Sequence, residues 1–433
     1  MDRRTFLKNT ALTVGALAAR TAAGKAASAN IGRGDRIVIS NPYEKVDWNT
    51  TQRHKAALHL HTLQSDGFQM VEEVVRAYHR AGYTIISITD HDWNEPNRRI
   101  VGHWGPLPAE QATPYPRDPK PDNFPANPTW PWTDYATPGP ADLGLVGIKG
   151  NELSYKHHIN SYYNDYGLWH GTPGDQIGHK APYRIVDAEG REIQEDDQLT
   201  AIGMKGGLGI LCHPSISDEH AWWERKSLRW YIERYRLHSS DYLIGMEITN
   251  NVPAHQAYDE GLWDQLLARF MPERPIWGFG NDDMHDLRSA NQTFNMLFLG
   301  ALSDTGVRKA METGQFCIYR STKYINYMMP SVEFSDFPDL KAIKIDQDSE
   351  TISIEAVNYD EIKWISAPAS LEPVEDYRTS NQPWPLGTVV HRGNTLDLRA
   401  APGLRRYVRA EIMRKDGDHI HRIFTNPFGI VKS

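Results

Sequence analysis

The sequence predicts an α/β fold in which a parallel β/α barrel is followed by a small β-sandwich. Three observations support this prediction. A strand, a helix and a second strand follow one another over residues 55–88, several later apolar runs end in polar residues, and short alternating runs replace helix-length periods from about residue 325. Because 433 residues exceed what one hydrophobic core usually supports, two folded domains are expected.

The first 29 residues resemble a twin-arginine export signal. Arg3 and Arg4 are followed by FLK at residues 6–8, a mildly apolar run and the ASA cleavage site at residues 27–29. A frayed amphipathic helix or an uncleaved membrane anchor is the alternative, but the apolar run is far shorter than the ~20 residues that span a bilayer. We therefore expect export by the twin-arginine machinery to the periplasm or the exterior, without a stable membrane anchor.

Composition and net charge limit the kinds of molecule that the protein is expected to bind. The chain is 40% hydrophobic and 24% charged, as ordinary globular proteins are. Its net charge is −8, and loss of residues 1–29, with five positive charges and one negative, changes it to −12. An acidic protein without a basic stripe binds nucleic acid poorly, so we expect a small-molecule substrate and no nucleic acid polymer.

The first β/α unit begins with an apolar run at residues 55–58 that enters the motif LHLHTLQSDG. A helix is predicted in the next segment, which ends at Gly82, because its apolar side chains share one face: Met70, Val71, Val74, Val75 and Tyr78. The β-branched run at residues 83–88 then predicts a strand buried on both faces. This order is that of a parallel β/α unit.

Residues 93–140 interrupt the alternation of strands and helices. They contain 12 of the 27 prolines and four tryptophans, so neither a regular helix nor a sheet is expected. The segment is either a surface excursion or a lid whose aromatic side chains line a pocket at the barrel mouth. Because it leaves directly from the TDHD sequence at residues 89–92, we favour the lid.

The remaining barrel elements resume after this insertion. Apolar runs that end in polar residues lie at 143–152, 206–214, 242–251 and 275–285, and amphipathic helices are expected at 228–235 and 261–270. The carboxyl ends of parallel strands meet at one rim of a barrel, so we expect the polar residues to converge there. Residues 325–433, with alternating runs such as 341–358, are assigned to the β-sandwich.

Histidines and carboxylates at the strand ends predict a metal centre. His59 and His61 project to the same side of a strand, so both imidazoles can reach one ion. Similar residues follow the other runs: Asp66, His91, Glu152, His157 or His158, His213, Asp283 and His285. Imidazole with carboxylate suits zinc, manganese or iron, and nine such ligands exceed one tetrahedral site, so two or three divalent ions are expected.

The two cysteines do not suggest a structural zinc site or a disulfide scaffold. Cys212 and Cys317 lie in separate apolar runs, and neither has a second cysteine nearby in sequence. We expect both to be unpaired core residues, with a single disulfide between them as the alternative.

The metal-competent motifs, in this order, resemble those of the PHP (polymerase and histidinol phosphatase) superfamily. The matching segments are LHLHTLQSDG, ITDHD, GNE with HHIN, LCHP and NDDMH, between about residues 54 and 290. The resemblance implies a distorted (β/α)7 barrel over residues 50–324 with two or three bound metal ions. Segments 360–366, 406–412 and 425–430 are similar to the C-terminal module of carbaryl- and carbofuran-hydrolase-like metallohydrolases.

The resemblance also implies how the ligands are divided. A first ion would take His59, His61, Glu152 and Asp283, a second would share Glu152 and add His158 and His213, and a third would take Asp66, His91 and His285. His158 is preferred to His157 because the Ile-Asn that follows it resembles the strand that continues in the family. An aspartate at position 66, where many relatives have histidine, resembles the phosphoesterases that keep three ions.

Other polar residues near the motifs are expected to play supporting parts. A structural carboxylate or one that orients a ligand is expected at Glu247. Four aspartates are expected to orient ligand imidazoles or bind water: Asp90, Asp92, Asp282 and Asp286. Lys156 and Arg288 are candidates for a phosphate contact.

The predicted chemistry is hydrolysis. Two divalent ions that share Glu152 would lower the pKa of a bridging water enough to supply hydroxide near neutral pH, and this hydroxide would attack phosphorus in line. The sequence therefore predicts an exported metal-dependent phosphoesterase that acts on small phosphodiesters or phosphomonoesters. The alternatives are a carbamate or carboxylic ester hydrolase with the same metal centre and a non-catalytic secreted binding protein.

Overall fold

The structure is a computed structural model that describes residues 36–62, 65, 67–91, 139–154, 157–164, 195–215, 226–250, 255–323, 332–379 and 381–432. Several predictions fall outside these ranges: the export signal, Asp66, Asp92, Lys156 and the insertion as far as residue 138. The described residues combine helices with several sheets, so the predicted α/β class is confirmed.

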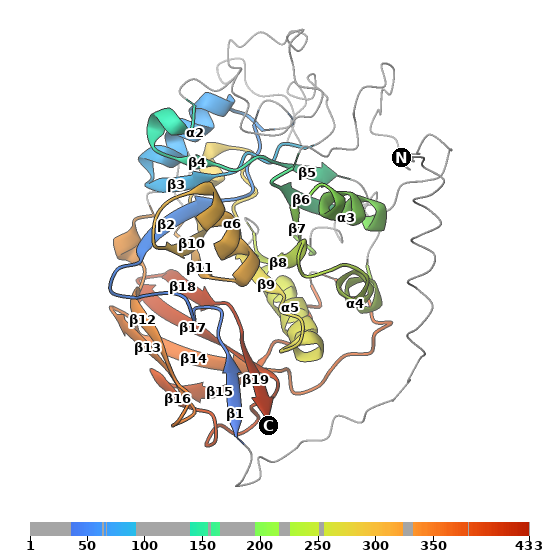
Figure 1. Cartoon of the computed structure of the whole chain (residues 1–433), viewed down its shortest axis with the longest axis vertical. Helices are drawn as coiled ribbons and strands as arrows, with labels where there is room; N and C mark the ends of the chain where they lie inside the picture. The colour runs from blue at the N-terminus through green and yellow to red at the C-terminus, as the bar shows by residue number, and fades with distance from the viewer. Residues whose placement is uncertain are drawn as a thin grey trace. The chain divides into compact units, whose positions relative to one another are not determined.

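The strands form three sheets (Figure 1). The largest has the order β1 (Ile37–Ser40), β19 (Phe428–Lys432), β17 (Tyr407–Asp416), β18 (His419–Thr425), β11 (Phe316–Ser321), β10 (Thr293–Leu299), β2 (Gln52–Ala57), β3 (Tyr83–Ile86) and β4 (Val146–Gly147), and β14 (Glu361–Ser366) pairs with β17 and with β15 (Thr388–Arg392). The second has the order β5 (Gly150–Ser154), β6 (His158–Tyr162), β7 (Leu208–Leu211), β8 (Leu243–Thr249) and β9 (Trp277–Gly280). The third consists of β12 (Asp339–Asp346), β13 (Thr351–Val357) and β16 (Thr395–Asp397).

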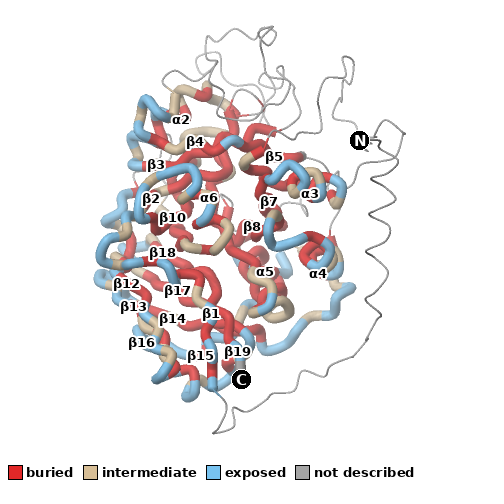
Figure 2. Tube along the Cα trace, in the orientation of Figure 1, coloured by how far each residue is buried: buried red, intermediate tan, exposed pale blue. Residues whose placement is uncertain are grey.

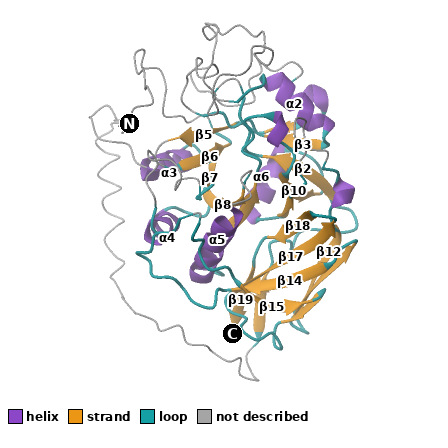
Figure 3. Ribbon diagram, turned by 180° about the vertical axis from the view of Figure 1, so that it is seen from behind, coloured by secondary structure: helices purple, strands orange, loops and turns teal. Residues whose placement is uncertain are grey.

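Four of the five α-helices among the described residues pack against these strands, and the fifth packs against another helix (Figures 1 and 3). They are α2 (Val71–Arg80) beside β3, α3 (Glu195–Met204) beside β7, α5 (Gln256–Phe270) beside β8, α4 (Leu228–Leu237) beside α5, and α6 (Asp304–Thr313) beside β10. None of them is long and apolar enough to cross a membrane.

Helix α2 forms for the reasons that the sequence predicts. Val71, Val74 and Val75 are buried on its inner face, and each fully buried aliphatic side chain contributes about 1.5–3 kcal/mol to folding. The chain leaves the helix through Gly82, whose φ of +82° favours glycine over other residues. The helix therefore fixes the spacing between the motif after β2 and the strand β3.

The strand pairings are parallel in two places and antiparallel elsewhere among the described strands. β2, β3 and β4 pair in parallel, and so do β7, β8 and β9, as β/α units require. β5, β6 and β7 pair antiparallel, because β6 begins only four residues after Ser154 and this is too short for a crossover. The run predicted as one strand at 143–152 is divided between β4 and β5, which belong to different sheets.

Two isolated parallel bridges connect the large sheet with the five-stranded sheet. Leu60, after β2, pairs with Met284, after β9, and His91, after β3, pairs with Glu152 in β5. No continuous ladder of described strands closes a barrel. The bridges nevertheless bring the carboxyl ends of β2, β3 and β9 together beside β5.

The five-stranded sheet is buried on both faces. All residues of β7, β8 and β9 are buried, as Figure 2 shows in red, and their continuous apolar sequences have the pattern that such strands require. The hydrophobic core between this sheet and its helices includes Trp263 and Phe279. Such packing fixes the positions of the strand ends. The polar residues at those ends are positioned with them.

The C-terminal residues continue the large sheet. β18 pairs with β11 on one side and with β17 on the other, so strand pairing runs across residue 325. A buried ion pair also connects β17 with α5, where Arg409 donates two hydrogen bonds to Asp264 at 2.8 and 2.9 Å. Described residues after α6 form strands and short turns without a further α-helix (Figure 3).

Candidate metal centre

The structure brings eight of the nine predicted ligands into overlapping clusters. The clusters are His59 with His61, Glu152 and Asp283; His91 with Glu152 and His158; His59 with Glu152, Cys212 and His213; and His61 with His91 and His285. Within each cluster the potential ligand atoms lie within 4.8 Å of one another. The ninth residue, Asp66, lies outside the described residues.

Glu152 occupies the middle of these clusters, and its two carboxylate oxygens face different histidines. Oε1 lies 2.9 Å from Nδ1 of His158 and 2.9 Å from Nε2 of His213. Oε2 lies 3.3 Å from Nε2 of His59, 3.1 Å from Nε2 of His61 and 3.2 Å from Nδ1 of His91. The carboxylate is thus positioned to share its oxygens between two ions.

Asp283 completes the group around Oε2. Its Oδ1 lies 3.2 Å from Nε2 of His59 and 3.2 Å from Nε2 of His61. His59 and His61 follow β2, whereas Asp283 follows β9, and the bridge between Leu60 and Met284 joins these two segments. The backbone pairing therefore explains why residues more than 200 positions apart share one site.

A third group of imidazoles lies beside the first. The rings of His61 and His285 are stacked with their centroids 4.1 Å apart, and the centroid of His91 is 4.6 Å from that of His61. The side chain of His285 is 35% exposed, while His61 is fully buried. This group therefore lies at the open side of the centre.

The geometry separates the two adjacent histidines. Nδ1 of His158 faces Glu152, but His157 belongs to none of the clusters. The ring of His157 is stacked on Trp230 with a centroid distance of 4.9 Å, and its Nε2 lies 3.3 Å from the hydroxyl of Tyr231. His158 is consequently the one that points toward the metal-competent residues.

Two of the candidate ligands have an unusual backbone conformation. His213 has a φ of 21° and Asp283 a φ of 46°, values that non-glycine residues seldom adopt. After His213, the backbone N–H and the hydroxyl of Ser215 both donate to Asp259 at 2.9 Å. These hydrogen bonds hold the loop in the conformation that turns His213 toward Glu152.

Glu247 supports the ligands from behind. It accepts hydrogen bonds from Nδ1 of His59 at 2.7 Å and from the backbone N–H of His213 at 2.9 Å. The side chains of Asn250 and Asn281 donate to it at 2.9 and 2.8 Å. Every described contact of Glu247 orients another group, as expected for a carboxylate that positions ligands.

Other predicted supporting residues have mainly structural contacts. Asp90 holds the loop after His61, since its Oδ1 accepts from the backbone N–H of Thr62 at 2.7 Å. Asp282 accepts three backbone N–H groups: those of Asn291, Gln292 and Thr293. Asp286 caps a 3-10 turn and pairs with Arg288 at 2.6 Å. A carboxylate therefore already engages the guanidinium group of Arg288.

Gly67 lets the loop after β2 pack tightly. A Cβ atom at this position would lie 2.6 Å from the carbonyl carbon of His61 and 2.7 Å from the backbone nitrogen of Thr62. Real Cβ atoms essentially never approach this closely. Any larger residue would therefore push the loop that carries His61.

The electrostatics of the centre favour a bound cation. Burial raises the pKa of Glu152, but His158, His59 and His91 outweigh burial and bring it well below its usual value. Burial lowers the pKa of His59, yet Asp283, Glu247 and Glu152 raise it well above the usual value. Burial also lowers the pKa of His158 to about 4, which leaves a neutral imidazole. The buried carboxylates are therefore ionised and attract positive charge.

The arrangement of donor atoms fits metal ions better than hydrogen bonds alone. Nε2 of His59 and Oδ1 of Asp283 are buried and have no hydrogen-bond partner among the described atoms, although they face each other. Ligand atoms about 2.0–2.1 Å from a tetrahedral zinc ion lie roughly 3.3 Å apart, close to the separations found here. Imidazole and carboxylate suit zinc, manganese or iron.

Cys212 is the one cluster member that was predicted only as a core residue. Both cysteines are buried and free, as expected. The Sγ of Cys212 accepts a hydrogen bond from the backbone N–H of Asn160 at 3.0 Å, and burial raises the pKa of the thiol well above its usual value. A thiol in this state is a poor ligand, because metals bind the thiolate. In the sequence, the only sign that Cys212 lies at this site is its position directly before His213.

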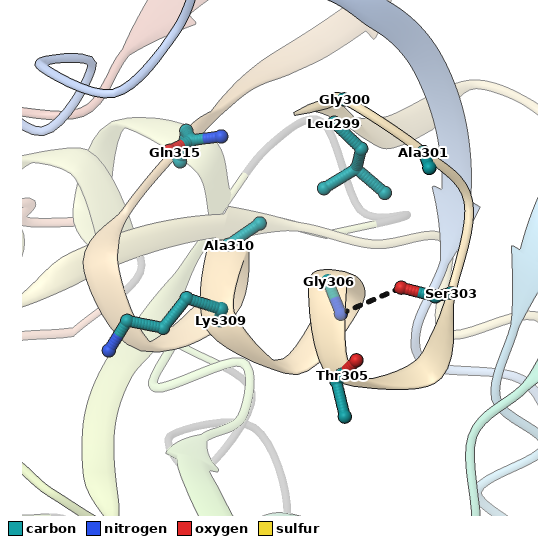
Figure 4. A pocket seen from close by; sticks show the side chains of 9 residues that line it. All are labelled: Leu299, Gly300, Ala301, Ser303, Thr305, Gly306, Lys309, Ala310 and Gln315. Atoms are coloured by element: carbon teal, nitrogen blue, oxygen red, sulfur yellow. Dashed lines mark hydrogen bonds between the residues drawn. The ribbon is translucent and has the colours of Figure 1, made fainter.

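A hollow of about 390 Å³ lies elsewhere, at the beginning of α6 (Figure 4). Its lining includes Ser303, whose side chain accepts the hydrogen bond from the backbone N–H of Gly306 that begins the helix. None of the lining residues belongs to the clusters around Glu152. The hollow is therefore separate from the metal-competent centre.

Comparison with known proteins yields similar structures only. No family model matches the chain, and no curated protein matches it. A two-domain protein from Bacteroides vulgatus ATCC 8482, described as containing a PHP-like metal-dependent phosphoesterase, is 14% identical with a TM-score of 0.43, and the match covers 93% of this chain and 100% of that chain.

Two further solved structures are similar over part of the chain. One, described as a metal-dependent phosphoesterase from Bifidobacterium adolescentis ATCC 15703, is 15% identical with a TM-score of 0.32 over 53% of this chain and 87% of that chain. The other, a lesion-specific endonuclease from Pyrococcus furiosus, is 11% identical with a TM-score of 0.33 over 60% of this chain and 56% of that chain. All three TM-scores are below 0.5, and similarity at this level carries no argument about the family, the reaction or the substrate of this chain.

Proposed function

We propose that this protein is a metal-dependent phosphoesterase of the PHP type that hydrolyses small phosphodiesters or phosphomonoesters. The observation that carries the proposal is the position of Glu152. Its two oxygens face two different sets of imidazoles in a buried site, which is the arrangement expected of a carboxylate shared by two ions. The ordered motifs of the sequence support the same function.

The proposed scaffold is a distorted (β/α)7 barrel formed by β2, β3 and β5 to β9. The parallel and antiparallel pairings of these strands, together with the two isolated bridges, support it, because they link the segments one after another. The antiparallel β6 is the proposed source of the distortion. Residues 325–433 are proposed to form the accompanying β-sandwich module.

The candidate ligands fall into three proposed groups. His59, His61, Glu152 and Asp283 would hold one ion, and Glu152, His158 and His213 a second. His91 and His285 would hold a third ion, with Asp66 from outside the described residues. Divalent ions bound there supply Lewis acidity, lower the pKa of water and offset the negative charge of phosphoryl oxygens.

The other residues of the site position the ligands and limit solvation. Glu247 holds the tautomer of His59 that turns Nε2 toward Glu152, and Asp259 holds the loop that carries His213. Burial of Glu152 and His59 removes competing water from the ligand atoms. Phosphoryl chemistry is favoured over attack on a carbonyl because the partly exposed His285 group provides a further place to hold charged oxygens.

We further propose that the protein is exported through the twin-arginine route and acts in the periplasm or outside the cell. The Arg-Arg motif and the ASA sequence support this proposal. The route carries folded proteins, so the metal centre would be assembled before export. The proposed partner is a small molecule that reaches the cell envelope.

A direct test compares three substrates with the same leaving group. The full chain is loaded in turn with manganese, zinc or iron, and turnover is measured for p-nitrophenyl phosphate, bis-p-nitrophenyl phosphate and p-nitrophenyl N-methylcarbamate. Faster hydrolysis of either phosphate ester by orders of magnitude is expected. Preference for the carbamate would overturn phosphoryl specificity, and absence of turnover with every metal would favour a binding protein.

A further inference from the structure

A second group of metal-competent side chains lies apart from Glu152, on the sheet formed by β11, β18 and β17. Potential ligand atoms of Asp336, Asp416 and His421 lie within 4.8 Å of one another. Asp336 ends the 3-10 turn Phe334–Asp336, Asp416 ends β17, and His421 lies in β18. None of these residues belongs to the motifs that resemble the PHP superfamily.

Strand register explains why these three side chains meet. His421 is paired with Arg414 of β17, and Asp416 lies two residues after Arg414, so both project from the same face of the sheet. The turn that contains Asp336 packs over this face, where the ring of Phe337 meets the imidazole of His421 edge-on at 5.4 Å. The sheet and the turn thus enclose the imidazole.

His421 is an unusual buried histidine. It is 0% exposed, and neither ring nitrogen has a hydrogen-bond partner in the described part of the chain. Buried polar atoms almost always have a partner, so this ring calls for an explanation. Burial also lowers the pKa of His421, which keeps the imidazole neutral and leaves one nitrogen with a lone pair.

The carboxylates of Asp336 and Asp416 supply negative charge beside the neutral imidazole of His421. Asp336 uses Oδ2 to accept hydrogen bonds from Nζ of Lys323 at 3.0 Å and from the backbone N–H of Glu333 at 2.9 Å. Burial raises its pKa, but these hydrogen bonds outweigh burial and lower the pKa below the usual value, so Asp336 is ionised. Its Oδ1 accepts no hydrogen bond from a described residue, and Asp416 is exposed to solvent.

Two positively charged side chains lie near the three candidate ligands, but neither takes the place of a metal ion between them. Lys323 contacts the oxygen of Asp336 that is already oriented by the turn. Arg414 donates to the backbone carbonyl groups of Ser335 and Asp336 at 2.6 and 3.2 Å, and no described contact joins it to either carboxylate. The two cations thus hold the turn Phe334–Asp336 in place. They do not separate the imidazole of His421 from the two carboxylates.

We propose that Asp336, Asp416 and His421 form a separate site for a divalent transition metal ion, for which zinc is the best match. One imidazole nitrogen and two carboxylate oxygens are ordinary zinc ligands, and water would complete a tetrahedron. The ion would fasten the end of the β17–β18 hairpin to the turn Phe334–Asp336. This site is independent of the hydrolytic centre proposed above.

The test compares zinc binding by the full chain with binding by two variants of the same hairpin. Asp416→Asn removes a proposed ligand at an exposed position, where the substitution is not expected to affect folding. Asp418→Asn changes an exposed aspartate of the adjacent turn that belongs to no cluster. Bound zinc is counted by equilibrium dialysis and mass spectrometry, and ions at the Glu152 centre cancel in the comparison.

We expect Asp416→Asn to bind one zinc ion fewer per chain and Asp418→Asn to bind as many as the native chain. Zinc should also raise the Tm of Asp418→Asn by more than that of Asp416→Asn. A third variant, His421→Gln, should lose the same ion. Equal zinc content and equal affinity in the native chain and in Asp416→Asn would overturn the proposal.

Discussion

Nδ1 of His59 donates a hydrogen bond to Glu247 over 2.7 Å, and both side chains are 0% exposed. A carboxylate can only accept this bond, so Nδ1 carries a hydrogen, and Nε2 is the nitrogen that faces Glu152 and Asp283 and would bind a metal ion. The pair thus sets the tautomer of a candidate metal ligand. The contribution of Glu247 to metal affinity can therefore be measured without changing the ligand His59.

Glu247→Gln should weaken metal binding about 10- to 100-fold, because the amide orients His59 less strongly and does not raise the basicity of its imidazole. Metal affinity is measured by competition with a chelator. Glu355→Gln, at an exposed position of β13, serves as the control and should bind metal as the native chain does. Unchanged affinity in Glu247→Gln would show that the hydrogen bond has no such role.

Asp283→Ala should remove one ion and nearly all turnover, because Asp283 faces both His59 and His61. Metal content and hydrolysis of the phosphate esters are measured on the same sample. Glu355→Ala is the control, since this exposed carboxylate of β13 belongs to no cluster. Full activity and metal content in Asp283→Ala would refute its assignment as a ligand.

The adjacent histidines provide a sharper comparison. His158→Ala should lose an ion, because Nδ1 of His158 lies 2.9 Å from Glu152. His157→Ala should keep its metal content, although loss of the contact with Trp230 will lower its stability. Elemental analysis of the two purified variants distinguishes them. The reverse result would mean that His157 is the ligand.

The buried pair of Asp264 and Arg409 should be a large single contribution to stability. Asp264→Ala would leave the guanidinium group buried without its partner, at a cost of about 3–5 kcal/mol. Urea denaturation measures the change in the free energy of unfolding. The double variant Asp264→Leu with Arg409→Met should be closer to the native chain than Asp264→Ala is. A change below about 1 kcal/mol in Asp264→Ala would contradict this expectation.

Asp259 predicts a specific dependence of stability on pH. Burial raises its pKa from 3.8 to about 8, although hydrogen bonds from Ser215 act in the opposite direction. The folded chain therefore holds a proton here that the unfolded chain releases near pH 4, so the contribution of this group is full below pH 4 and is lost as the pH rises toward 8.

Asp259→Asn removes this titration while keeping a side chain of similar shape. The free energy of unfolding of the native chain, measured relative to that of Asp259→Asn, should fall between pH 5 and pH 8. Urea denaturation at three pH values in this window checks the sign. Parallel pH profiles for the two proteins would show that the carboxyl does not hold the proton.

Sequence patterns predicted the local elements because short-range forces determine them. The inward face of α2 and its end at Gly82 follow from apolar spacing and from the conformational freedom of glycine. The apolar runs at residues 206–214, 242–251 and 275–285 likewise predicted the strands β7, β8 and β9. The division of residues 143–152 between β4 and β5 was missed, because it depends on which sheet each part joins.

By itself, the sequence determined which side chains were available for a metal centre and where each stood at the end of a strand. Only the tertiary structure decided that Glu152 turns its two oxygens toward different imidazoles, that His158 and not His157 faces it, and that Glu247 orients His59. Likewise, only the tertiary structure brought Asp336, Asp416 and His421 together. Such contacts join residues far apart in the chain, so they are set by strand register and packing, which local composition does not encode.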